Sequence, residues 1–352
     1  MSFRKNISKV LFPLTCWYAV GVRFRNMFYS MGIIKQEAPH ITTIGVGNLS
    51  TGGTGKTPHV EHLVRLLRGE TRVAVLSRGY RRQTKGFVLA DAGSTAATIG
   101  DEPLQMHRKF GDITVAVDAD RRHGIALLLQ QEPKPGVILL DDAYQHRYVK
   151  AGLNILLTDY HRLFSRDLVL PAGRLREPRS GKRRADIVVV TKCPPTMSEA
   201  ERQAIASELA LETRQHLYFS CIDYAPLEPL AGGPALPLEA LNQHHVLLLS
   251  GIANPTPLEN TLKVHASEVR TMQFADHHTF TASDMERVAD AFGTLAEPRL
   301  LVTTETDAAR LEGTGLLPPT LREHGYTIPI RIRFLFGQGE TFDEEIKNYG
   351  LV

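Results

Sequence analysis

The chain of 352 residues is long enough to form two domains with substantial cores. Its 43% hydrophobic and 22% charged residues are typical of a soluble globular protein, and its net charge of +3 gives no general footprint for binding nucleic acid. The three cysteines, Cys16, Cys193 and Cys221, lie too far apart for a metal or redox motif, which favours a reduced, cytosolic setting.

The first 36 residues are basic, because no acidic residue precedes Glu37. Their apolar stretch VLFPLTCWYAVGV (10–22) is only about half as long as a membrane span. A basic region followed by an apolar one also fits a signal peptide, but no small-residue cleavage site follows. The mixture of basic and bulky apolar residues favours an amphipathic helix on an anionic membrane surface. A helix packed on the core of its own domain is the alternative.

The stretch GVGNLSTGGTGKTP (45–58) lies between an apolar run (41–44) and the helix-like HVEHLVRLLR. Strand, glycine loop, Lys-Thr and helix form the arrangement of a phosphate-binding P-loop, in which backbone N–H groups surround an anion. Lys56 would reach the β- and γ-phosphates, and the Thr57 hydroxyl would hold Mg²⁺. The predicted nucleotide-binding residues are Ser50, Thr51, Gly52, Gly53, Thr54, Gly55, Lys56 and Thr57.

These glycines have two other interpretations. A dinucleotide-binding loop is weaker, because its third glycine would fall on Ser50. A glycine-rich turn with a surface lysine is the structural alternative. Ser50 also replaces the first glycine of the general P-loop pattern.

Short Val/Ile/Leu-rich runs alternate with helical stretches as far as about residue 191. These runs are 73–77, 112–117, 136–142, 154–159 and 186–192. Such runs are typical of strands buried on both faces, so the predicted fold is α/β, with a P-loop doubly wound, mostly parallel sheet. A Pro- and Gly-rich stretch at 222–240 then precedes a second, smaller α/β domain. The predicted divisions are an N-terminal membrane-associated helical segment (1–36), a P-loop domain (37–221), and a connector with the smaller domain (222–352).

Acidic residues follow predicted structural elements at two places. Asp141 and Asp142 end an apolar strand, where a P-loop enzyme places the carboxylate of its Mg²⁺ site, and spacing alone does not decide which one contacts the ion. Asp101 lies in the tight loop IGDEP (99–103) and is a candidate general base for a hydroxyl nucleophile. A strand-end turn and a capped turn are the corresponding structural alternatives.

Histidines and arginines supply the remaining candidates. In FADHHTF (274–280), Asp276 and His277 are better suited to orient a catalytic carboxylate than to bind zinc. The loop 170–186 is crowded with arginines, and an arginine beside a nucleotide site can hold an anionic substrate. The candidates for substrate binding are Arg121, Arg174 and Arg176. Solvated surface is the alternative for both groups.

Taken together, the motifs resemble one family, the tetraacyldisaccharide 4′-kinases, also called lipid A 4′-kinases. The segments that carry the resemblance run in order through nearly the whole chain and are VGNLSTGGTGKTP (46–58), LSRGY (76–80), GDEP (100–103), LLDDAYQHR (139–147), LPAGRLREP (170–178), FADHHTF (274–280) and VTTETDAAR (302–310). Family members more often have TTEKD where this chain has TTETD, so Thr306 stands where the family has a lysine. Ser50 is normal for this family.

The resemblance implies a kinase that uses ATP and Mg²⁺ to phosphorylate the 4′-hydroxyl of a tetraacyldisaccharide 1-phosphate, a lipid A precursor. It implies peripheral attachment to the cytoplasmic face of the inner membrane of a Gram-negative bacterium, and no obligate protein partner is indicated. By motif position, Lys56 and Thr57 match the phosphate and Mg²⁺ ligands, and Asp142 with Asp141 matches the metal-site acids. The catalytic set carried over in this way is Asp101 as base, His277 with Asp276 as its partner, and Lys56.

Two alternatives of other classes stay open. A P-loop ATPase acting as a switch would need neither an acceptor-directed base nor a membrane helix. A metal hydrolase could instead use Asp141, Asp142, His277 and His278, and its activity would not depend on Lys56.

Overall fold

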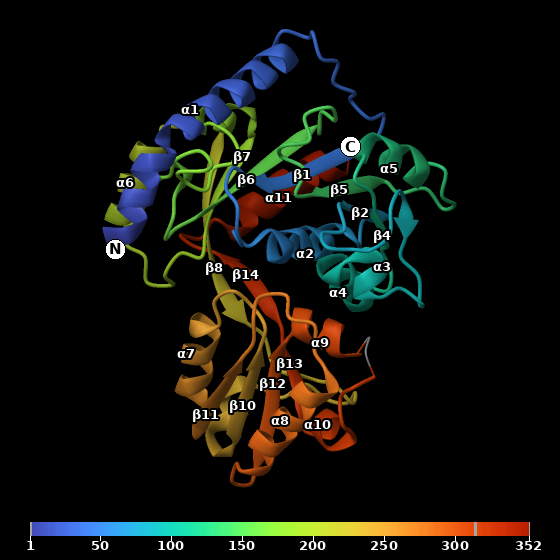
Figure 1. Cartoon of the computed structure of the whole chain (residues 1–352). Coiled ribbons are helices and arrows are strands. Elements are labelled where there is room, and N and C mark those ends of the chain that lie inside the picture. The colour runs from blue at the N-terminus through green and yellow to red at the C-terminus, as the bar shows by residue number, and fades with distance from the viewer. Residues whose placement is uncertain (1, 313–314, 352) are drawn as a thin grey trace.

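The protein consists of two α/β lobes, one above the other in Figure 1. This computed structural model describes residues 2–312 and 315–351. The large lobe contains the strands β1 (Thr42–Asn48), β2 (Val73–Ser77), β3 (Val88–Leu89), β4 (Thr114–Val117), β5 (Val137–Asp141), β6 (Leu153–Asp159), β7 (Ile187–Thr191), β8 (His216–Tyr224) and β14 (Ile330–Phe334). Its helices are α1 (Ser2–Ser30), α2 (Lys56–Leu67), α3 (Ala96–Ile99), α4 (Asp101–Lys109), α5 (Arg121–Leu128), α6 (Glu199–Leu209) and α11 (Gly339–Gly350), with 3₁₀ turns η1 (Phe164–Arg166) and η2 (Arg179–Arg184).

The large sheet has nine strands in the order β14-β8-β7-β6-β1-β5-β2-β4-β3. Pairing is parallel from β8 through to β4, and only the edge strands β14 and β3 run antiparallel to their neighbours. Strands β2, β5 and β7 are buried at every position, as expected for strands covered on both faces. The predicted α/β fold with a doubly wound, mostly parallel sheet is therefore confirmed.

Strand order places the carboxyl ends of β1 and β5 side by side. Strand β1 pairs in parallel with β5 on one side and with β6 on the other. In open α/β sheets, ligands bind outside the carboxyl ends of the strands, where the order of connections reverses. The loops that follow β1 and β5 are therefore the parts of the large lobe best placed to form a site.

The smaller lobe is built on a second sheet in the order β11-β10-β12-β13-β9. Its elements are η3 (Leu238–Gln243), β9 (Glu228–Pro229), β10 (His245–Ser250), α7 (Thr256–His265), β11 (Glu268–Gln273), α8 (Ala282–Gly293), β12 (Arg299–Thr304), α9 (Glu305–Glu312), α10 (Pro319–Glu323) and β13 (Gly325–Ile328). Leu247, Leu249, Phe292 and Leu301 form part of its own apolar core, so this lobe is a second packing unit.

The chain passes between the lobes twice, along neighbouring strands. It leaves the large lobe after β8 and returns through β14, which pairs antiparallel with β8 from Ile330↔Tyr224 to Phe334↔Ser220. After this return, α11 packs against α2 and β1 of the large lobe. The boundaries at residues 36 and 221 that the sequence suggested stay a prediction.

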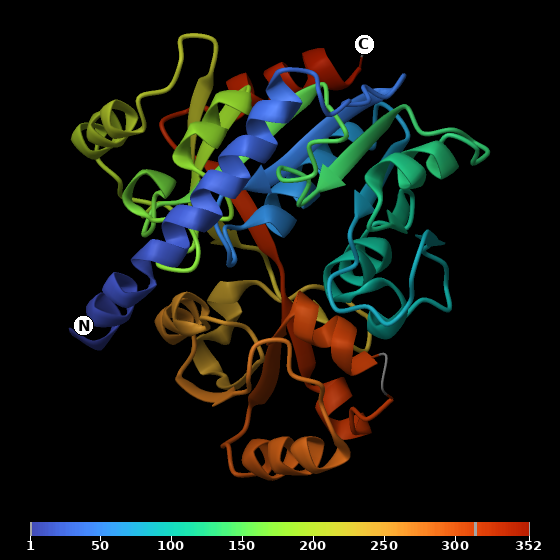
Figure 2. The same cartoon turned by 45° about the horizontal axis from the view of Figure 1, so that its top comes forward.

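Helix α1 crosses the outside of the large lobe (Figure 2). It is held there by polar contacts, since Thr15 Oγ1 accepts a hydrogen bond from Ala172 N at 3.0 Å and Asn26 donates one to Glu177 at 3.2 Å. Its exposed side chains include the apolar Leu14, Trp17, Tyr18, Val20, Phe24, Met27 and Phe28, together with the basic Arg23 and Arg25. Within the described part of the chain, no helix has the length and apolarity needed to span a bilayer.

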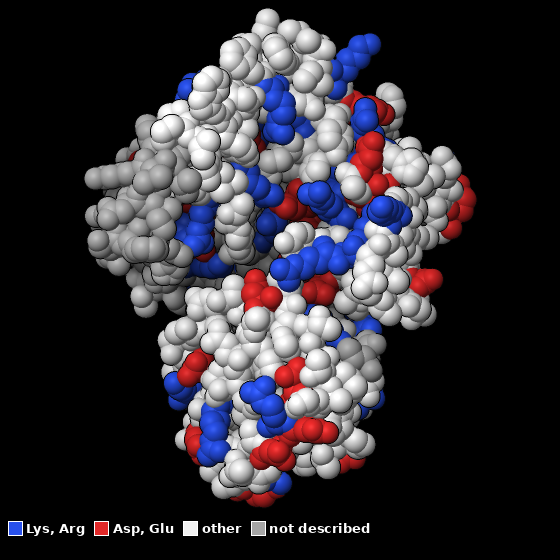
Figure 3. Space-filling view, viewed as in Figure 1, with Lys and Arg blue, Asp and Glu red and all other residues white. Residues whose placement is uncertain are grey.

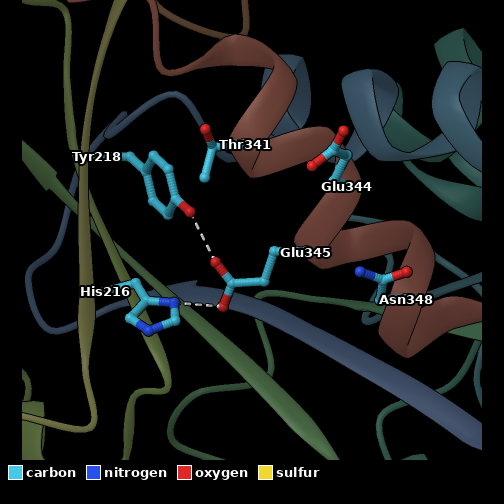
Figure 4. Close-up of a pocket in the computed structure, with 6 residues that line it drawn as sticks. All are labelled: His216, Tyr218, Thr341, Glu344, Glu345 and Asn348. Carbon is cyan, nitrogen blue, oxygen red and sulfur yellow. Dashed lines mark hydrogen bonds and ion pairs between the residues drawn. The ribbon is translucent and has the colours of Figure 1, made fainter.

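An open hollow of about 470 Å³ lies between β8 and α11 (Figure 4). In it, Glu345 accepts a hydrogen bond of 2.7 Å from the Tyr218 hydroxyl and pairs with His216 at 2.7 Å. Burial and the bond to Glu345 raise the pKa of Tyr218 above its usual range. These contacts tie α11 to the edge of the sheet.

Candidate active site

The P-loop connects β1 to α2 in a conformation that requires glycine. Gly52 has φ 109° and Gly55 has φ 83°, a region that side chains with a Cβ rarely adopt. Helix α2 begins at Lys56, directly after Gly55, so its first N–H groups point toward the loop. The sequence-predicted order of strand, glycine loop and helix is present, and Lys56 lies at the helix N-terminus.

Neighbouring segments fix the loop from several sides. Asn48, the last residue of β1, donates a hydrogen bond of 2.8 Å to the hydroxyl of Thr54. Thr191 at the end of β7 donates one to the carbonyl of Thr54 at 2.9 Å, and Lys192 contacts the carbonyl of Gly53. On the other side, Thr51 N donates to the carbonyl of Arg174 at 2.8 Å. The loop is therefore preorganised before any phosphate arrives.

Asp141 and Asp142 follow β5 and have opposite environments. Burial, reinforced by Glu102 and Asp142, raises the pKa of Asp141 to about 7, against the opposing charge of Lys56. Asp142 is also partly buried, but its hydrogen bonds to Arg176 and the charge of Lys56 hold the pKa of that carboxyl well below its usual range. Oδ2 of Asp141 accepts a hydrogen bond from Ser77, whereas its buried Oδ1 has no partner among the described residues.

Two cations share Asp142. Lys56 Nζ lies 3.6 Å from Oδ1 of Asp142, and Arg176 binds both oxygens of the same carboxylate, at 2.8 and 3.1 Å. The backbone of Arg176 also donates a hydrogen bond of 2.7 Å to the carbonyl of Leu49. A planar guanidinium matches a carboxylate or a phosphate in this bidentate manner. The cluster therefore holds two positive groups beside the P-loop with one acid between them.

A second cluster forms where the lobes meet. Asp101 begins α4 of the large lobe, and His277 comes from the loop after β11 in the smaller lobe. His277 Nδ1 lies 3.0 Å from Oδ2 of Asp101, and this hydrogen bond is the main cause that raises the pKa of His277. Asp276 Oδ2 lies 3.9 Å from Nε2 of the same imidazole. Oδ1 of Asp101 has no protein partner among the described residues, so it is available to a ligand.

The loop that carries His277 is held in place by contacts with Gly251 and Arg310. His277 has φ 58°, and its N–H donates a hydrogen bond of 3.1 Å to the carbonyl of Gly251. Arg310 of α9 donates to the carbonyls of Gly251 and His278 at 3.3 and 3.2 Å and lies 3.7 Å from Asp101. Asp307, fully buried, pairs with Arg310 at 2.8 Å. A backbone in this sparsely populated region persists because its surroundings hold it there.

Basic side chains gather on the face of the large lobe that borders the smaller lobe, with acidic groups among them (Figure 3). The two clusters are within electrostatic reach of each other, because Glu102, next to Asp101, contributes to the raised pKa of Asp141, after burial. The P-loop and the acids after β5 thus form one cluster in the large lobe, and the Asp101–His277 pair forms a second one where the lobes meet. This combination suits phosphoryl transfer to a hydroxyl acceptor.

Comparison with known proteins agrees with this geometry. The family model for tetraacyldisaccharide-1-P 4′-kinase matches residues 7–349. The chain belongs to this kinase family. Proteins named tetraacyldisaccharide 4′-kinase are 47% identical in Phocaeicola vulgatus, over 97% of this chain and 95% of that protein, and 48% identical in Parabacteroides distasonis, over 96% and 94%.

A solved structure of the same kinase family has the same fold. The crystal structure of LpxK from Aquifex aeolicus in complex with ATP superposes with a TM-score of 0.76 at 28% identity. The match covers 97% of this chain and 99% of that chain. The family membership inferred from the motifs is therefore confirmed across both lobes.

The structure places the predicted arginines of this kinase in three different settings. Arg176 points to Asp142, while Arg174 supports the P-loop through its carbonyl oxygen. Arg121 is fully buried and donates hydrogen bonds to the carbonyls of Asp118 and Asp141. Arg121 therefore lies beneath the site and supports the end of β5, and its predicted contact with substrate stays a prediction.

Two residues of the site were not among the sequence candidates. Glu177 is fully buried and binds Arg184 through both oxygens, at 2.7 and 2.8 Å, while Gln145 and Asn26 also donate to it. Arg310 reaches Asp101 from α9. Both lie inside motifs that carried the family resemblance, Glu177 in LREP and Arg310 in TDAAR, so the motifs contained them without indicating their roles.

The second histidine of the kinase's FADHHTF motif has a structural setting. His278 Nε2 lies 2.9 Å from Asp284, and its ring packs against those of Phe274 and Phe280, which also contact each other. Across residues 2–312 and 315–351, no three or more His, Cys, Asp or Glu side chains are grouped so that they could hold a metal ion. The geometry thus gives His278 a partner in its own lobe.

Proposed function

We propose that this chain transfers the γ-phosphoryl group of ATP to the 4′-hydroxyl of a tetraacyldisaccharide 1-phosphate. The observation that carries the proposal is the carboxylate of Asp101, whose Oδ2 is bound to His277 and whose Oδ1 has no partner among the described residues. The names of the family model and of its relatives support the acceptor, and the ATP complex of the Aquifex aeolicus protein supports the donor.

The large lobe binds the nucleotide phosphates in this proposal. Backbone N–H groups of residues 50–57 surround the phosphates, and Lys56 turns from Asp142 to the γ-phosphate. Arg176, already beside Asp142, helps balance the charge that develops on the transferred group. The backbone donors of the loop and Arg176 are fixed in advance, so they need little reorganisation as the reaction proceeds, whereas Lys56 changes its partner.

Asp101 acts as the general base of the reaction. Its Oδ1 accepts the proton of the sugar hydroxyl while that oxygen attacks phosphorus in line with the departing ADP. His277 donates a hydrogen bond to Oδ2 and so fixes the direction of Oδ1, and Asp276 supports the imidazole on its far side. The pair joins the two lobes, so closure of the lobes also excludes water from the acceptor position.

The residues at the end of β5 fit a Mg²⁺ ion. The buried Oδ1 of Asp141 lacks a partner among the described residues, Asp142 lies beside it, and the Thr57 hydroxyl starts α2 next to Lys56. One or two carboxylates, a hydroxyl and substrate phosphates are the usual ligands of Mg²⁺ in such sites. When bound, the ion would neutralise charge on the phosphate oxygens.

Helix α1 places the enzyme at the cytoplasmic face of the inner membrane in this proposal. Its exposed apolar side chains, Trp17 at 77% and Phe24 at 53% exposure among them, would enter the lipid boundary. Arg23 and Arg25 would meet anionic headgroups. The substrate is acylated, and leaving the bilayer would cost it about 0.8 kcal/mol per CH₂ group, so the enzyme has to work where the lipid lies.

Mass spectrometry of the product tests the proposed function. With MgATP and a tetraacyldisaccharide 1-phosphate in mixed micelles, we expect a product heavier by one phosphoryl group, located at the 4′ position by fragmentation. Label from γ-labelled ATP should enter the lipid. Label released only as inorganic phosphate would contradict the proposal and favour a switch ATPase, and turnover that survives loss of Lys56 would favour a metal hydrolase.

The membrane role of α1 predicts a separable defect. Replacing both Trp17 and Phe24 by serine should weaken binding to anionic vesicles by roughly 100-fold or more, because each buried side chain contributes about 1.5–3 kcal/mol. Turnover of substrate in detergent should stay near the wild-type rate. Vesicle co-sedimentation measures the first effect. Unchanged sedimentation would indicate that α1 serves only to cover the large lobe, and Val264→Ser, at an exposed site on the other lobe, is the control.

A further inference from the structure

Helices α4 and α9 lie side by side and antiparallel across the junction of the lobes. At the start of α4, Oδ2 of Asp101 lies 3.7 Å from Nε of Arg310, which is near the end of α9. At the end of α4, Lys109 forms an ion pair with Glu305, the first residue of α9. The catalytic end and the far end of α4 are thus both attached to the same helix of the smaller lobe.

The contacts between these two ends are specific. Thr306 donates a hydrogen bond of 2.6 Å to the side chain of Gln105, and Arg108 donates one of 3.0 Å to the carbonyl of Ala309. The methyl group of Ala309 is buried in an apolar cluster that includes Leu104. The two helices therefore have one register, set by alternating polar and apolar contacts.

Lys109 also reaches a third helix. Its ammonium lies 2.7 Å from Oε2 of Glu61 in α2, the helix that begins at Lys56. Glu61 is almost fully buried and also accepts hydrogen bonds of 2.7 Å from Gln105 and Arg65. One side chain therefore joins the helix of the P-loop, the helix of Asp101 and the first helix after β12.

The charges in this cluster depend on Lys109. Burial and the neighbouring Glu61 raise the pKa of Glu305, and Lys109 opposes that rise. Removing the Lys109 cation would leave Glu305 facing Glu61 in a poorly solvated place, with Arg65 bound to Glu61 alone. Two carboxylates in such a place move apart or take up a proton. Such a contact differs from an exposed ion pair, which contributes little.

A purely local role is the alternative. Lys109 lies in the last turn of α4 and Glu305 in the first turn of α9, and both positions are favourable for the helix dipoles. A local role predicts a change in thermal stability with unchanged turnover. A role in joining the helices predicts that turnover also falls, because Arg310 on α9 holds the loop of His277.

We propose that Lys109 is a positioning residue of the phosphoryl transfer. By bridging Glu61 and Glu305, it fixes α9 along α4 and thereby holds His277 against Asp101. This inference rests on the proposed roles of Asp101 and His277. Lys109 would thus help to position the two lobes although it lies outside the P-loop, the metal-site acids and the Asp101–His277 pair.

Lys109→Met tests the proposal through its kinetic pattern. We expect kcat to fall by about 10- to 100-fold, since a misplacement of about 1 Å can cost 10²-fold, while the KM for ATP changes by less than about threefold. Lys134→Met, at an exposed lysine of the same lobe, is the matched control and should behave as wild type. A kcat for Lys109→Met equal to that of the control would overturn the proposal.

Exchanging the charges gives a second test that does not depend on one variant folding well. Lys109→Glu alone places three carboxylates in the cluster and should be more impaired than Lys109→Met. Combined with Glu305→Lys, it restores a cation between the carboxylate of Glu61 and the one at position 109. In this double variant α9 supplies the cation. We expect this double variant to regain at least about tenfold in kcat over Lys109→Glu. A double variant no better than the single one would contradict the bridging role.

A distance measurement separates this inference from the proposed function. Spin labels at exposed Lys150 and Val264 report on the two lobes once exposed Cys16 is replaced by serine, since Cys193 and Cys221 are buried. Lys109→Met should broaden or shift the distance distribution, and Lys134→Met should not. An unchanged distance distribution in Lys109→Met would refute the role of Lys109. Failure of the wild-type protein to phosphorylate the lipid would instead refute the proposed function, and the distance measurement would still test the contact between the lobes.

Discussion

Asp101→Asn should lower kcat by about 10²–10⁴-fold while ATP binding is retained. Asparagine has the same size as aspartate and can still accept a hydrogen bond from His277 on its carbonyl oxygen. It cannot take up the proton of an attacking hydroxyl. The effect should therefore appear in the chemical step, measured as single-turnover transfer of labelled phosphoryl to the lipid, and not in the affinity for nucleotide.

The control for this variant is Asp112→Asn, which changes an exposed aspartate that pairs with Arg68 at 3.1 Å on the surface of the same lobe. It should leave both binding and turnover unchanged. A single-turnover rate for Asp101→Asn within about threefold of wild type would exclude Asp101 as the base. A matching loss of ATP affinity would instead indicate that the substitution disturbs the P-loop.

Lys56→Met should lower kcat by roughly 10²–10³-fold, the range expected when one preorganised donor to a developing charge is removed. Methionine keeps much of the length and apolar body of lysine but supplies no charge to the γ-phosphate. Asp142 would keep its bidentate contact with Arg176, so the cluster after β5 should survive. Steady-state kinetics should show that most of the loss lies in kcat.

Lys150→Met is the corresponding control, because this lysine is exposed and its backbone N–H binds the carbonyl of Glu37 far from the P-loop. Its kinetics and melting temperature should match those of wild type. If Lys56→Met turned over at the control rate, phosphate binding by the P-loop would be excluded as a requirement. The metal-hydrolase alternative would then regain support.

The strands of the large lobe could be predicted because their pattern is local. Near-continuous Val, Ile and Leu runs at 73–77 and 136–142 correspond to β2 and β5, which are buried throughout. Strand β1 continues through Gly45 and Gly47 to Asn48, beyond the predicted end at residue 44. Glycines weaken a strand by their own preference, but pairing with both β5 and β6 overrides it here.

The site could be predicted only in part, because sequence patterns are local and the site joins segments that are far apart in the chain. The P-loop is a contiguous motif, so its glycines and Lys56 were found from spacing. Asp101 and His277 are 176 positions apart, and their pairing came from a family resemblance. The burial of Arg121 was not predictable, because an arginine at the start of an amphipathic helix has the same local sequence whether it faces solvent or a strand end. Long-range packing decides between these outcomes.

The double passage of the chain between the lobes also constrains how they can swing. A single flexible linker would allow one lobe to rotate freely relative to the other. Here β8 and β14 leave as an antiparallel pair, and their hydrogen bonds make a ribbon that resists torsion but can flex across its width. We therefore expect any relative movement of the lobes to be a bending about this two-stranded connection, which keeps His277 of the smaller lobe on the side of Asp101.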